Sequence, residues 1–277
     1  MDVGIGLPNA VPSTEGDQLV DWARRADVAG FSSLGTIDRI AYPNYEPLVS
    51  LAAAAAVTER IGLATSILIA PTRHSAAVLA KQAASVNALS GGRLTLGVAP
   101  GGREDDYAAA GEPFERRGAR FEEMLGELRE TWDGDEVGPP GQPRLILGGS
   151  VDAAYRRAAE HGAGWIMGGG TPEMLEEGRA KLEQAWSSAG REGRPRCMAL
   201  AYYALGEDAE QAAEAYLTDY YAWMGDYAGQ IAASAAKDPD TVKGYLDGFE
   251  AAGCDELILF PCSPDPEQVE LLAEATL

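Results

Sequence analysis

Glycine-rich clusters follow several apolar stretches of this chain, in a pattern that suits phosphate binding. Two of them, residues 148–150 (GGS) and 168–171 (GGGT), stand between an apolar run and a helical pattern. Glycine lets the backbone approach a ligand closely, and the amino-terminal end of a helix offers free N–H groups and a positive dipole end. Two such ends on neighbouring strands suit one phosphate group. The alternative interpretation is that the glycines only form tight turns.

Charged side chains follow two other apolar runs. Asp38 and Arg39 come directly after one run, and Glu104, Asp105 and Asp106 come shortly after another. A carboxylate at the end of a strand is well placed for general acid–base chemistry. We therefore take Asp38, Arg39 and Glu104 as candidate catalytic residues. For the acidic trio, an ordinary solvated loop is the alternative.

The sequence lacks the residue patterns of several other kinds of site, namely metal centres, catalytic triads and nucleotide-binding loops. No group of His, Cys and carboxylate residues has metal-ligand spacing, so we expect no metal. Two histidines leave little material for a Ser–His–Asp triad, and neither glycine cluster has the spacing of a dinucleotide or P-loop motif. The three cysteines are widely spaced, which is typical of free thiols in a reducing cytoplasm.

The elements that would position these residues alternate between strand and helix along the whole chain. Strand cores such as Leu145–Leu147 and Leu257–Leu259 are apolar throughout, which is typical of parallel strands buried on both faces. Eight such strands, each followed by a helix, favour a closed (β/α)8 TIM barrel over an open doubly wound sheet. We expect a single domain over residues 1–277. In this fold, ligands bind at the carboxyl ends of the strands, where the strand-to-helix loops converge.

The predicted strands are Val3–Leu7, Ser32–Thr36, Ile61–Ile69, Arg93–Val98, Arg144–Leu147, Gly164–Met167, Arg196–Ala204 and Glu256–Phe260. The predicted helices are Asp17–Ala29, Glu46–Thr58, Ser75–Leu89, Phe114–Trp132, Ala153–His161, Pro172–Ala189, Glu207–Trp223, a further stretch to Lys237, Pro239–Ala252 and Pro266–Thr276.

The charge of the chain argues against two classes of partner. Its net charge of −21 repels nucleic acid and anionic membranes, so we expect neither as a partner. The amino-terminal residues do not have the pattern of a signal peptide, and no stretch of about 18 consecutive apolar residues predicts a membrane span. We therefore expect a cytoplasmic protein that acts on a small molecule.

Two segments of the chain resemble a known family. The segment TSILIAPTRHSAAVLAKQAASVNALSGGRLTLGV, followed by AAAGEPFERRGARFEEMLGELRETW, is similar to the bacterial luciferase-like superfamily of flavin and deazaflavin oxidoreductases. The later PRLILGGS and AGWIMGGGTPE resemble that family's phosphate loops. The resemblance extends from the first predicted strand to about Met174 and is strongest over Ile61–Trp132.

The resemblance implies a barrel without metal that holds coenzyme F420 or FMN at the carboxyl-end mouth. It also implies a non-proline cis peptide at Ser66–Ile67, beside the cofactor ring. The implied ring-pocket residues are Asp38, Thr65, Ser66, Ile67, Gly97 and Gly101. The implied phosphate-binding residues are Gly148, Gly149, Ser150, Gly168, Gly169, Gly170 and Thr171.

Three functions remain open at this stage. The first is an F420-dependent oxidoreductase that transfers a hydride to or from a small organic substrate, and the second is an FMN-dependent monooxygenase or reductase. The third is a catalytically silent barrel that binds a cofactor. This last alternative arises because many family members have a histidine after the second strand, where this chain has Arg39. A phosphosugar isomerase is a weaker alternative, since we find no base glutamate paired with an electrophilic His or Lys.

The resemblance also implies a homodimer. The chain has little sequence between Trp132 and Pro143 to cover the site. We therefore expect an open pocket, or one closed by a dimer partner or by the helices within residues 207–237.

Overall fold

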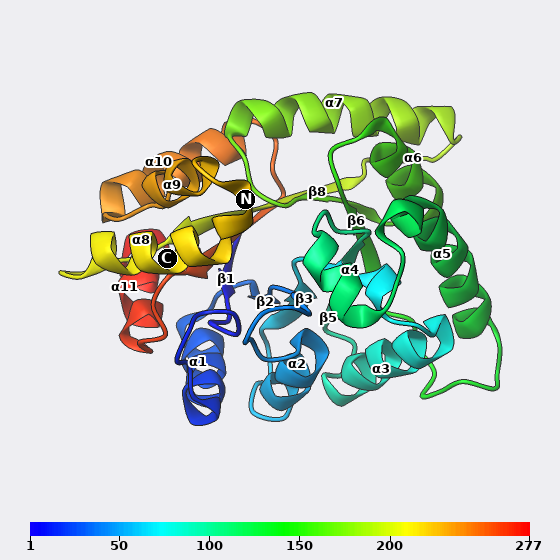
Figure 1. Ribbon diagram of the computed structural model, residues 1–277, viewed down its shortest axis with the longest axis horizontal. Helices are drawn as coiled ribbons and strands as arrows, with labels where there is room; N and C mark the ends of the chain where they lie inside the picture. Colours follow the sequence, from blue (N-terminus) through cyan, green and yellow to red (C-terminus); the bar gives the residue numbers. More distant parts are fainter.

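The computed structural model describes residues 1–277 and forms a closed barrel of parallel strands surrounded by helices (Figure 1). The strands are β1 (Asp2–Gly6), β2 (Ser33–Thr36), β3 (Gly62–Thr65), β4 (Leu68–Ile69), β5 (Leu94–Ala99), β6 (Arg144–Gly148), β7 (Gly164–Met167), β8 (Arg196–Tyr203) and β9 (Glu256–Pro261). The strand order β3-β2-β1-β9-β8-β7-β6-β5-β4 closes through a direct β3–β5 pairing. The two short strands β3 and β4 are halves of one barrel strand, so eight strand positions close the barrel. The predicted TIM barrel is confirmed.

The helices form the outer ring, apart from α4, which lies inside that ring in Figure 1. They are α1 (Gly16–Ala29), α2 (Pro47–Ala55), α3 (Ala76–Leu89), α4 (Glu104–Ala110), α5 (Arg117–Asp133), α6 (Asp152–His161), α7 (Pro172–Ser188), α8 (Ala209–Tyr220), α9 (Tyr227–Ala233), α10 (Pro239–Ala251) and α11 (Glu267–Thr276). No helix is both long and apolar enough to cross a membrane.

The third barrel strand is interrupted where the cis peptide was expected. A cis bond joins Ser66 to Ile67, between β3 and β4, so that expectation is confirmed. Both halves pair with β5. Gly97 of β5 permits this close approach, because a Cβ atom there would lie 2.1 Å from the Thr65 carbonyl oxygen. The Thr65 hydroxyl in turn donates to the Gly97 carbonyl at 2.7 Å.

The apolar residues divide into two buried clusters. One cluster of 50 residues fills the layer between the strands and the outer helices, where Trp22, Leu63 and Phe121 are buried. The second, of 20 residues, includes barrel-interior side chains such as Ile146 and Phe260. Burying a Leu, Ile or Phe side chain contributes about 1.5–3 kcal/mol, so these two clusters are the main source of stability.

Most predicted elements occur within two or three residues of their expected bounds. The stretch expected to reach Lys237 ends four residues earlier, at Ala233 of α9, and three differences of another kind follow. The strand expected over Ile61–Ile69 is divided at Ser66–Ile67. The helix expected over Glu207–Trp223 ends at Tyr220, and a short 3₁₀ turn, Ala222–Met224, follows before Gly225, whose φ of 59° stops any continuation. The helix α4 was not predicted. Three acidic residues in its first turn, which suit the positive end of a helix dipole, were the available signal.

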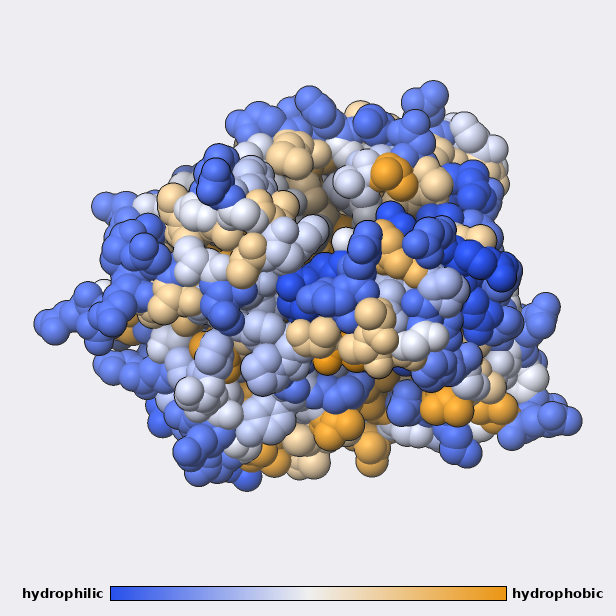
Figure 2. Space-filling model, viewed as in Figure 1, coloured by the Kyte–Doolittle hydropathy of each residue, from blue (hydrophilic) through white to orange (hydrophobic).

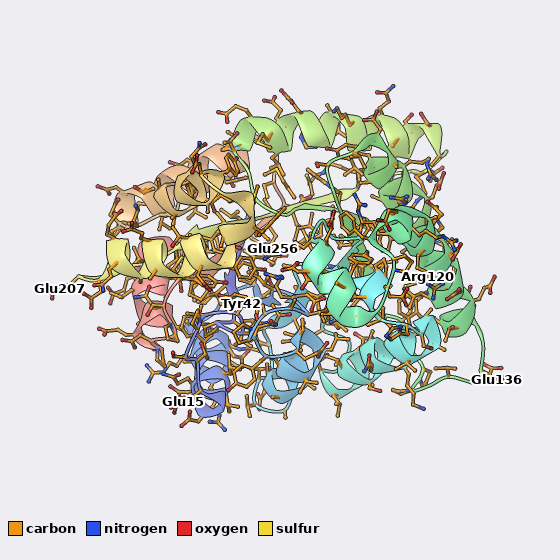
Figure 3. The ribbon with its side chains drawn as sticks, in the orientation of Figure 1. Glu15, Tyr42, Arg120, Glu136, Glu207 and Glu256 are labelled. Carbon is orange, nitrogen blue, oxygen red and sulfur yellow. The ribbon has the colours of Figure 1, made fainter.

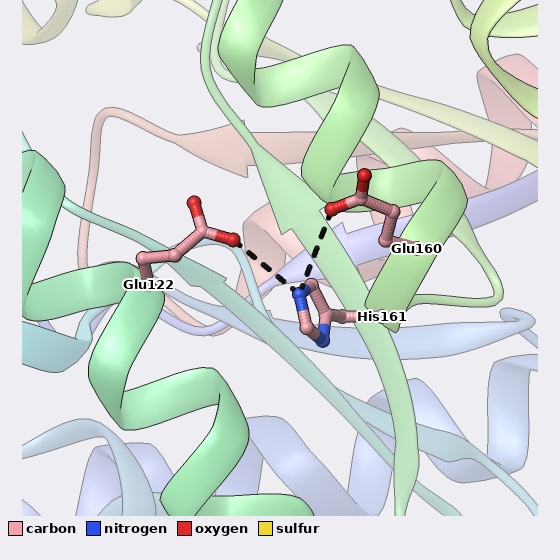
Figure 4. Close-up of side chains that lie close together, drawn as sticks. All are labelled: Glu122, Glu160 and His161. Carbon is pink, nitrogen blue, oxygen red and sulfur yellow. Dashed lines mark ion pairs between the residues drawn. The ribbon is translucent and has the colours of Figure 1, made fainter. Parts of the chain in front are cut away.

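An ion-pair cluster joins α5 to α6 on the outside of the barrel (Figure 4). Glu122 of α5 accepts from Arg157 at 2.7 Å and from Arg156 at 3.0 Å, while His161 lies 3.5 Å away. Glu160 completes a group of carboxylate and imidazole atoms close enough to hold a cation. The two arginines already balance the charge of Glu122, so the cluster is best described as an ion-pair link between helices α5 and α6.

This ion-pair link predicts that the free energy of unfolding depends on pH. Desolvation raises the pKa of Glu122, but hydrogen bonds from Arg157 and Arg156 outweigh it and lower the pKa from 4.5 to about 2. A lowered folded-state pKa gives stability that is present above pH 4.5 and is lost as the pH falls toward 2. We expect Glu122→Gln to cost about 1 kcal/mol at pH 7, a figure reduced for solvent screening, and progressively less between pH 5 and pH 3.

Urea unfolding of both proteins across this pH range tests the expectation. Glu123→Gln is the matched control, because Glu123 is more exposed and meets its arginines only at 3.5 and 3.6 Å. A Glu122→Gln deficit that stays constant from pH 7 to pH 3 contradicts the assignment.

Candidate functional site

The strand ends bring most of the predicted site residues to one mouth of the barrel. Because every strand pairing is parallel, the loops that follow the strands all emerge at the same end. Figure 2 shows the surface hollowed between α7, α8 and α4, with apolar atoms at its base. The residues gathered at this end are Asp38, Arg39, Thr65, Ser66, Ile67, Gly101, Gly148, Gly149, Ser150, Gly168, Gly169, Gly170 and Thr171.

Asp38 is fully engaged with neighbouring groups. Its carboxylate accepts from Arg73 Nη1 at 2.5 Å, from Arg73 Nη2 at 3.0 Å and from the backbone N–H of Ile69 at 2.7 Å. Burial raises the pKa of Asp38, while Arg73 and the Ile69 N–H act against that rise. Asp38 thereby links the end of β2 to β4, the second half of the interrupted strand. In this arrangement it positions the backbone.

Arg39 is a buried cation held along one edge of its guanidinium group. Its Nε donates to both oxygens of Asp106, at 3.0 and 2.8 Å, and its Nη2 donates to Asp105 at 2.8 Å. Its Cζ lies 5.3 Å from the ring centre of Tyr42 and 5.6 Å from that of Tyr220, within the range of cation–π attraction.

Asp106 is a central residue that sequence reasoning did not separate from its neighbours. It is completely buried, and besides Arg39 it accepts from the backbone N–H groups of Ile40 and Ala41, both at 2.8 Å. It therefore fixes the loop after β2 against α4. The alternative of a solvated loop for the acidic trio does not apply to this residue. Glu104, by contrast, is exposed in the first turn of α4 and takes no part in the buried ion pair of Arg39 and Asp106.

Two buried polar atoms at the mouth have no hydrogen-bond partner. They are the hydroxyl oxygen of Ser66 and Nη1 of Arg39. A buried donor or acceptor without a partner costs about 1–3 kcal/mol, and more when it is charged, so such atoms need an explanation. Both belong to loops after adjacent strands, since Thr36 of β2 pairs with Thr65 of β3. A polar molecule that came within hydrogen-bond distance would satisfy them, but neither atom is open to solvent in this structure.

The two glycine clusters end at the amino termini of α6 and α7, as the sequence predicts. Gly149 has a φ of 123°, a conformation that favours glycine, and it turns the chain from β6 toward α6. The cap residue of α6, Val151, supplies no side-chain acceptor; the Ala154 N–H donates to the Val151 carbonyl at 2.7 Å, and the earlier N–H groups of Asp152 and Ala153 have no side-chain cap. Thr171 caps α7 by accepting from the Met174 N–H at 3.4 Å.

Aromatic side chains of α8 cover one side of the mouth. Tyr42, labelled in Figure 3 below α8, donates through its hydroxyl to Asp219 of that helix at 2.6 Å, and Arg103 donates to the Tyr220 carbonyl at 2.8 Å. Tyr42 and Tyr220 also pack edge to face, with ring centres 5.2 Å apart. The helices within residues 207–237 thus contribute to the cover of the mouth, which is one of the alternatives left open for closure. The periodic tyrosines of α8 were the signal.

The contacts of Asp106 predict a large stability effect. Asp106→Ala leaves a buried guanidinium and two N–H groups without their acceptor, and removing one partner of a buried ion pair costs about 3–5 kcal/mol. We expect denaturant unfolding to show this decrease in the free energy of unfolding. We also expect faster hydrogen exchange of the backbone N–H groups in the loop after β2. Glu104→Ala, an exposed change in the same helix, is expected to stay within about 1 kcal/mol. Equal losses in the two variants would refute the role assigned to Asp106.

Comparison with known proteins agrees with this architecture. Residues 1–251 match the family model described as luciferase-like monooxygenase. An uncharacterised protein of Mycobacterium tuberculosis is 35% identical over 207 residues, which is 61% of this chain and 71% of that protein. An F420-dependent glucose-6-phosphate dehydrogenase of Amycolatopsis mediterranei is 30% identical over 171 residues, covering 58% of this chain and 50% of the relative.

Solved structures share the fold over nearly the whole chain. An F420-dependent secondary alcohol dehydrogenase, in complex with an F420–acetone adduct, superimposes with a TM-score of 0.84 at 18% identity, over 99% of this chain and 97% of the other. The monooxygenase RslO1 from Streptomyces bottropensis gives a TM-score of 0.81 at 22% identity, over 100% and 98%. The match of the family model over most of the chain shows that this protein belongs to the luciferase-like monooxygenase family.

Proposed function

We propose that this protein is an oxidoreductase that uses coenzyme F420 to transfer a hydride to or from a small organic substrate. The observation that carries the proposal is the uncapped amino terminus of α6, which shares the barrel mouth with the unpaired hydroxyl of Ser66. One end of the mouth thus suits a phosphate, and the other suits a polar ring edge. The F420-dependent relative and the F420-bound structural neighbour support the choice of this cofactor.

The residues at the mouth fit such a group. Free N–H groups at the start of α6 and its positive dipole end favour a phosphate. The hydroxyl of Ser66 accepts or donates a hydrogen bond, as a heterocycle with carbonyl and N–H edges requires. The apolar side chain of Ile67 lies against Gly148, where a Cβ atom would come within 2.4 Å of Ile67 Cδ1. Any larger residue at Gly148 would push Ile67 into the space of the ring.

The protein's own residues position and enclose the reactants. The loop at residues 148–150 holds the phosphate, and Ser66 and Ile67 set the depth of the ring. Tyr42 and Tyr220 exclude water on the α8 side. The deazaflavin, when bound, supplies a ring carbon that carries the hydride. Asp38 is engaged by Arg73, so in this proposal it orients the broken strand.

The second candidate is an FMN-dependent monooxygenase or reductase on the same barrel. The fold shared with the monooxygenase RslO1 favours it. The coverage of the mouth by α8 also supplies the shielding from water that a reactive oxygen adduct needs. A silent barrel would bind either cofactor without turnover.

A fluorescence titration with F420 and with FMN, side by side, tests the proposal. We expect micromolar or tighter binding of F420 and much weaker binding of FMN. Ser150→Asp adds a negative charge beside the α6 amino terminus and should weaken F420 binding at least ~10-fold, which is about 1.4 kcal/mol. Ser150→Asn is the neutral control and should bind normally. Thermal melting should match for the two variants, since the added charge suits the helix dipole.

Each other outcome has a definite meaning. Binding of FMN alone supports the monooxygenase, and oxygen uptake is then the assay. Binding of neither cofactor removes the proposed function. Unchanged F420 affinity in Ser150→Asp removes the phosphate-loop assignment alone.

We also propose that two copies associate through α2 and α3. These adjacent helices carry no acidic residue, although the chain has 43 in 277 residues, and they expose Val49, Val78 and Leu89. Figure 2 shows apolar atoms over this region. For molecules with a net charge of −21, an apolar face without acidic residues is the surface on which two copies approach with least repulsion.

Sedimentation velocity at micromolar concentration tests this association. We expect a dimer for the unmodified protein and a shift to monomer for Val78→Glu, which places a charge in the interface. Val28→Glu is the control, because Val28 is 79% exposed on α1, which is not one of the two helices of the proposed interface. A monomeric unmodified protein, or an equal effect of both substitutions, would rule the interface out.

A further inference from the structure

We propose that the amino-terminal end of the barrel, opposite the mouth, carries a binding site for a small organic phosphate monoester. Arg144 begins β6 and Gly148 ends it, so this site is separate from the glycine cluster at the mouth. The inference does not depend on the proposed function, because none of the residues that carry it belongs to the mouth.

The site is a cavity of about 320 Å³ between the last turns of α5 and the start of β6. Small-molecule sites have volumes of about 300–1,000 Å³, so this cavity suits a small ligand. Its cationic wall is formed by Arg129 and Arg144. Its apolar wall is formed by Leu125, Trp132 and Leu145. An anion with an apolar body matches this pair of walls.

Arg144 is the cation best placed to bind an external anion. It is exposed, and its side chain makes no hydrogen bond or ion pair within the protein. It also lines a second cavity, of about 300 Å³, together with Arg194 and Arg196. The one acidic residue of that cavity, Asp255, already accepts from Arg194 and from the Cys197 N–H. Arg144 therefore lies where two cavities rich in arginine adjoin.

Arg129 is held in place by backbone carbonyl groups and not by a carboxylate. Its Nη2 donates to the carbonyls of Glu160 and His161 at the end of α6, at 3.2 and 3.3 Å. These bonds orient the guanidinium, while its Nε and Nη1 make no hydrogen bond within the protein. The His161 ring, also in the wall, points toward Glu122 of α5 in Figure 4. Asp133, the one acidic residue of this cavity, is exposed at the end of α5.

Two guanidinium groups without carboxylate partners favour an anion with several acceptor oxygens. A guanidinium binds phosphate through paired N–H donors that lie in one plane. A phosphate monoester has three terminal oxygens and a charge of about −1.5 to −2 at pH 7, so it can accept from Arg129 and Arg144 together. The chain as a whole has a net charge of −21, so binding of such an anion requires a local group of cations.

Titration calorimetry with phenyl phosphate tests the site, with phenol and inorganic phosphate as separate probes. Phenyl phosphate contacts both walls, so we expect it to bind at least ~10-fold more tightly than either of the other two probes. Arg144→Gln removes one guanidinium and should weaken this binding at least ~10-fold. Arg129→Gln, which removes the other guanidinium, should have the same effect.

Arg24→Gln is the matched control, because Arg24 is an exposed arginine on α1 that has no ion pair. It should leave phenyl phosphate binding unchanged. Thermal melting should be the same for Arg144→Gln and Arg24→Gln, since neither side chain has a partner within the protein. Equal weakening of binding in these two variants would reflect net charge alone and would overturn the site. Phenyl phosphate that binds no better than phenol would overturn it too.

The Ser150→Asp protein separates this site from the glycine cluster at the mouth. We expect it to bind phenyl phosphate as the unmodified protein does, because Ser150 lies at the opposite end of the barrel from Arg144. Loss of binding in Ser150→Asp, with none in Arg144→Gln, would assign the phosphate to the mouth. That result overturns the inference and leaves the proposed function standing.

Discussion

The buried contact between Asp106 and the segment from Arg39 to Ala41 organises the mouth of this barrel. A single, completely buried carboxylate accepts from one guanidinium and two backbone N–H groups. Burying that carboxylate is tolerable only because each of its neighbours is a donor. The contact joins residues 67 positions apart in the sequence and closes the loop after β2 onto α4. Once this loop is fixed, Tyr42 is placed to meet α8.

A second buried ion pair, between Asp38 and Arg73, fixes another part of the same mouth. Asp38 binds Arg73 and the N–H of Ile69, and so draws β4 toward the end of β2. Adjacent residues, Asp38 and Arg39, therefore bind different partners at the same mouth, Asp38 through Arg73 and Arg39 through Asp106. This explains why a sequence-adjacent acid and base are both buried without pairing with each other. It also explains how a barrel can tolerate an interrupted strand at Ser66–Ile67, because the two halves are tied separately.

The barrel itself was predictable from the sequence because its strands are continuous apolar runs and its helices have clear periodicity. The glycine clusters after β6 and β7 were also predictable, since helix amino termini preceded by glycines have a local signature. Asp106 was not predictable as a separate residue, because its burial depends on Arg39, which no local pattern connects to it. The exposed position of Glu104, only two residues away, shows how strongly the orientation of one short helix decides such roles. The unpaired atoms of Ser66 and Arg39 likewise follow only from tertiary packing.

The α8 cover over the mouth is held to the rest of the barrel by its buried tyrosines and by several long-range hydrogen bonds. Tyr42 reaches Asp219 across 177 positions, and Arg103 reaches Tyr220 across 117. The glycine clusters after β6 and β7 take no part in these contacts. The residues from α8 to Tyr221 meet the barrel through the loops after β2 and β5 and through Tyr202 of β8. A change of sequence in this segment therefore requires matching changes at Tyr42, Arg103 and Tyr202, while the two glycine clusters are free to stay as they are.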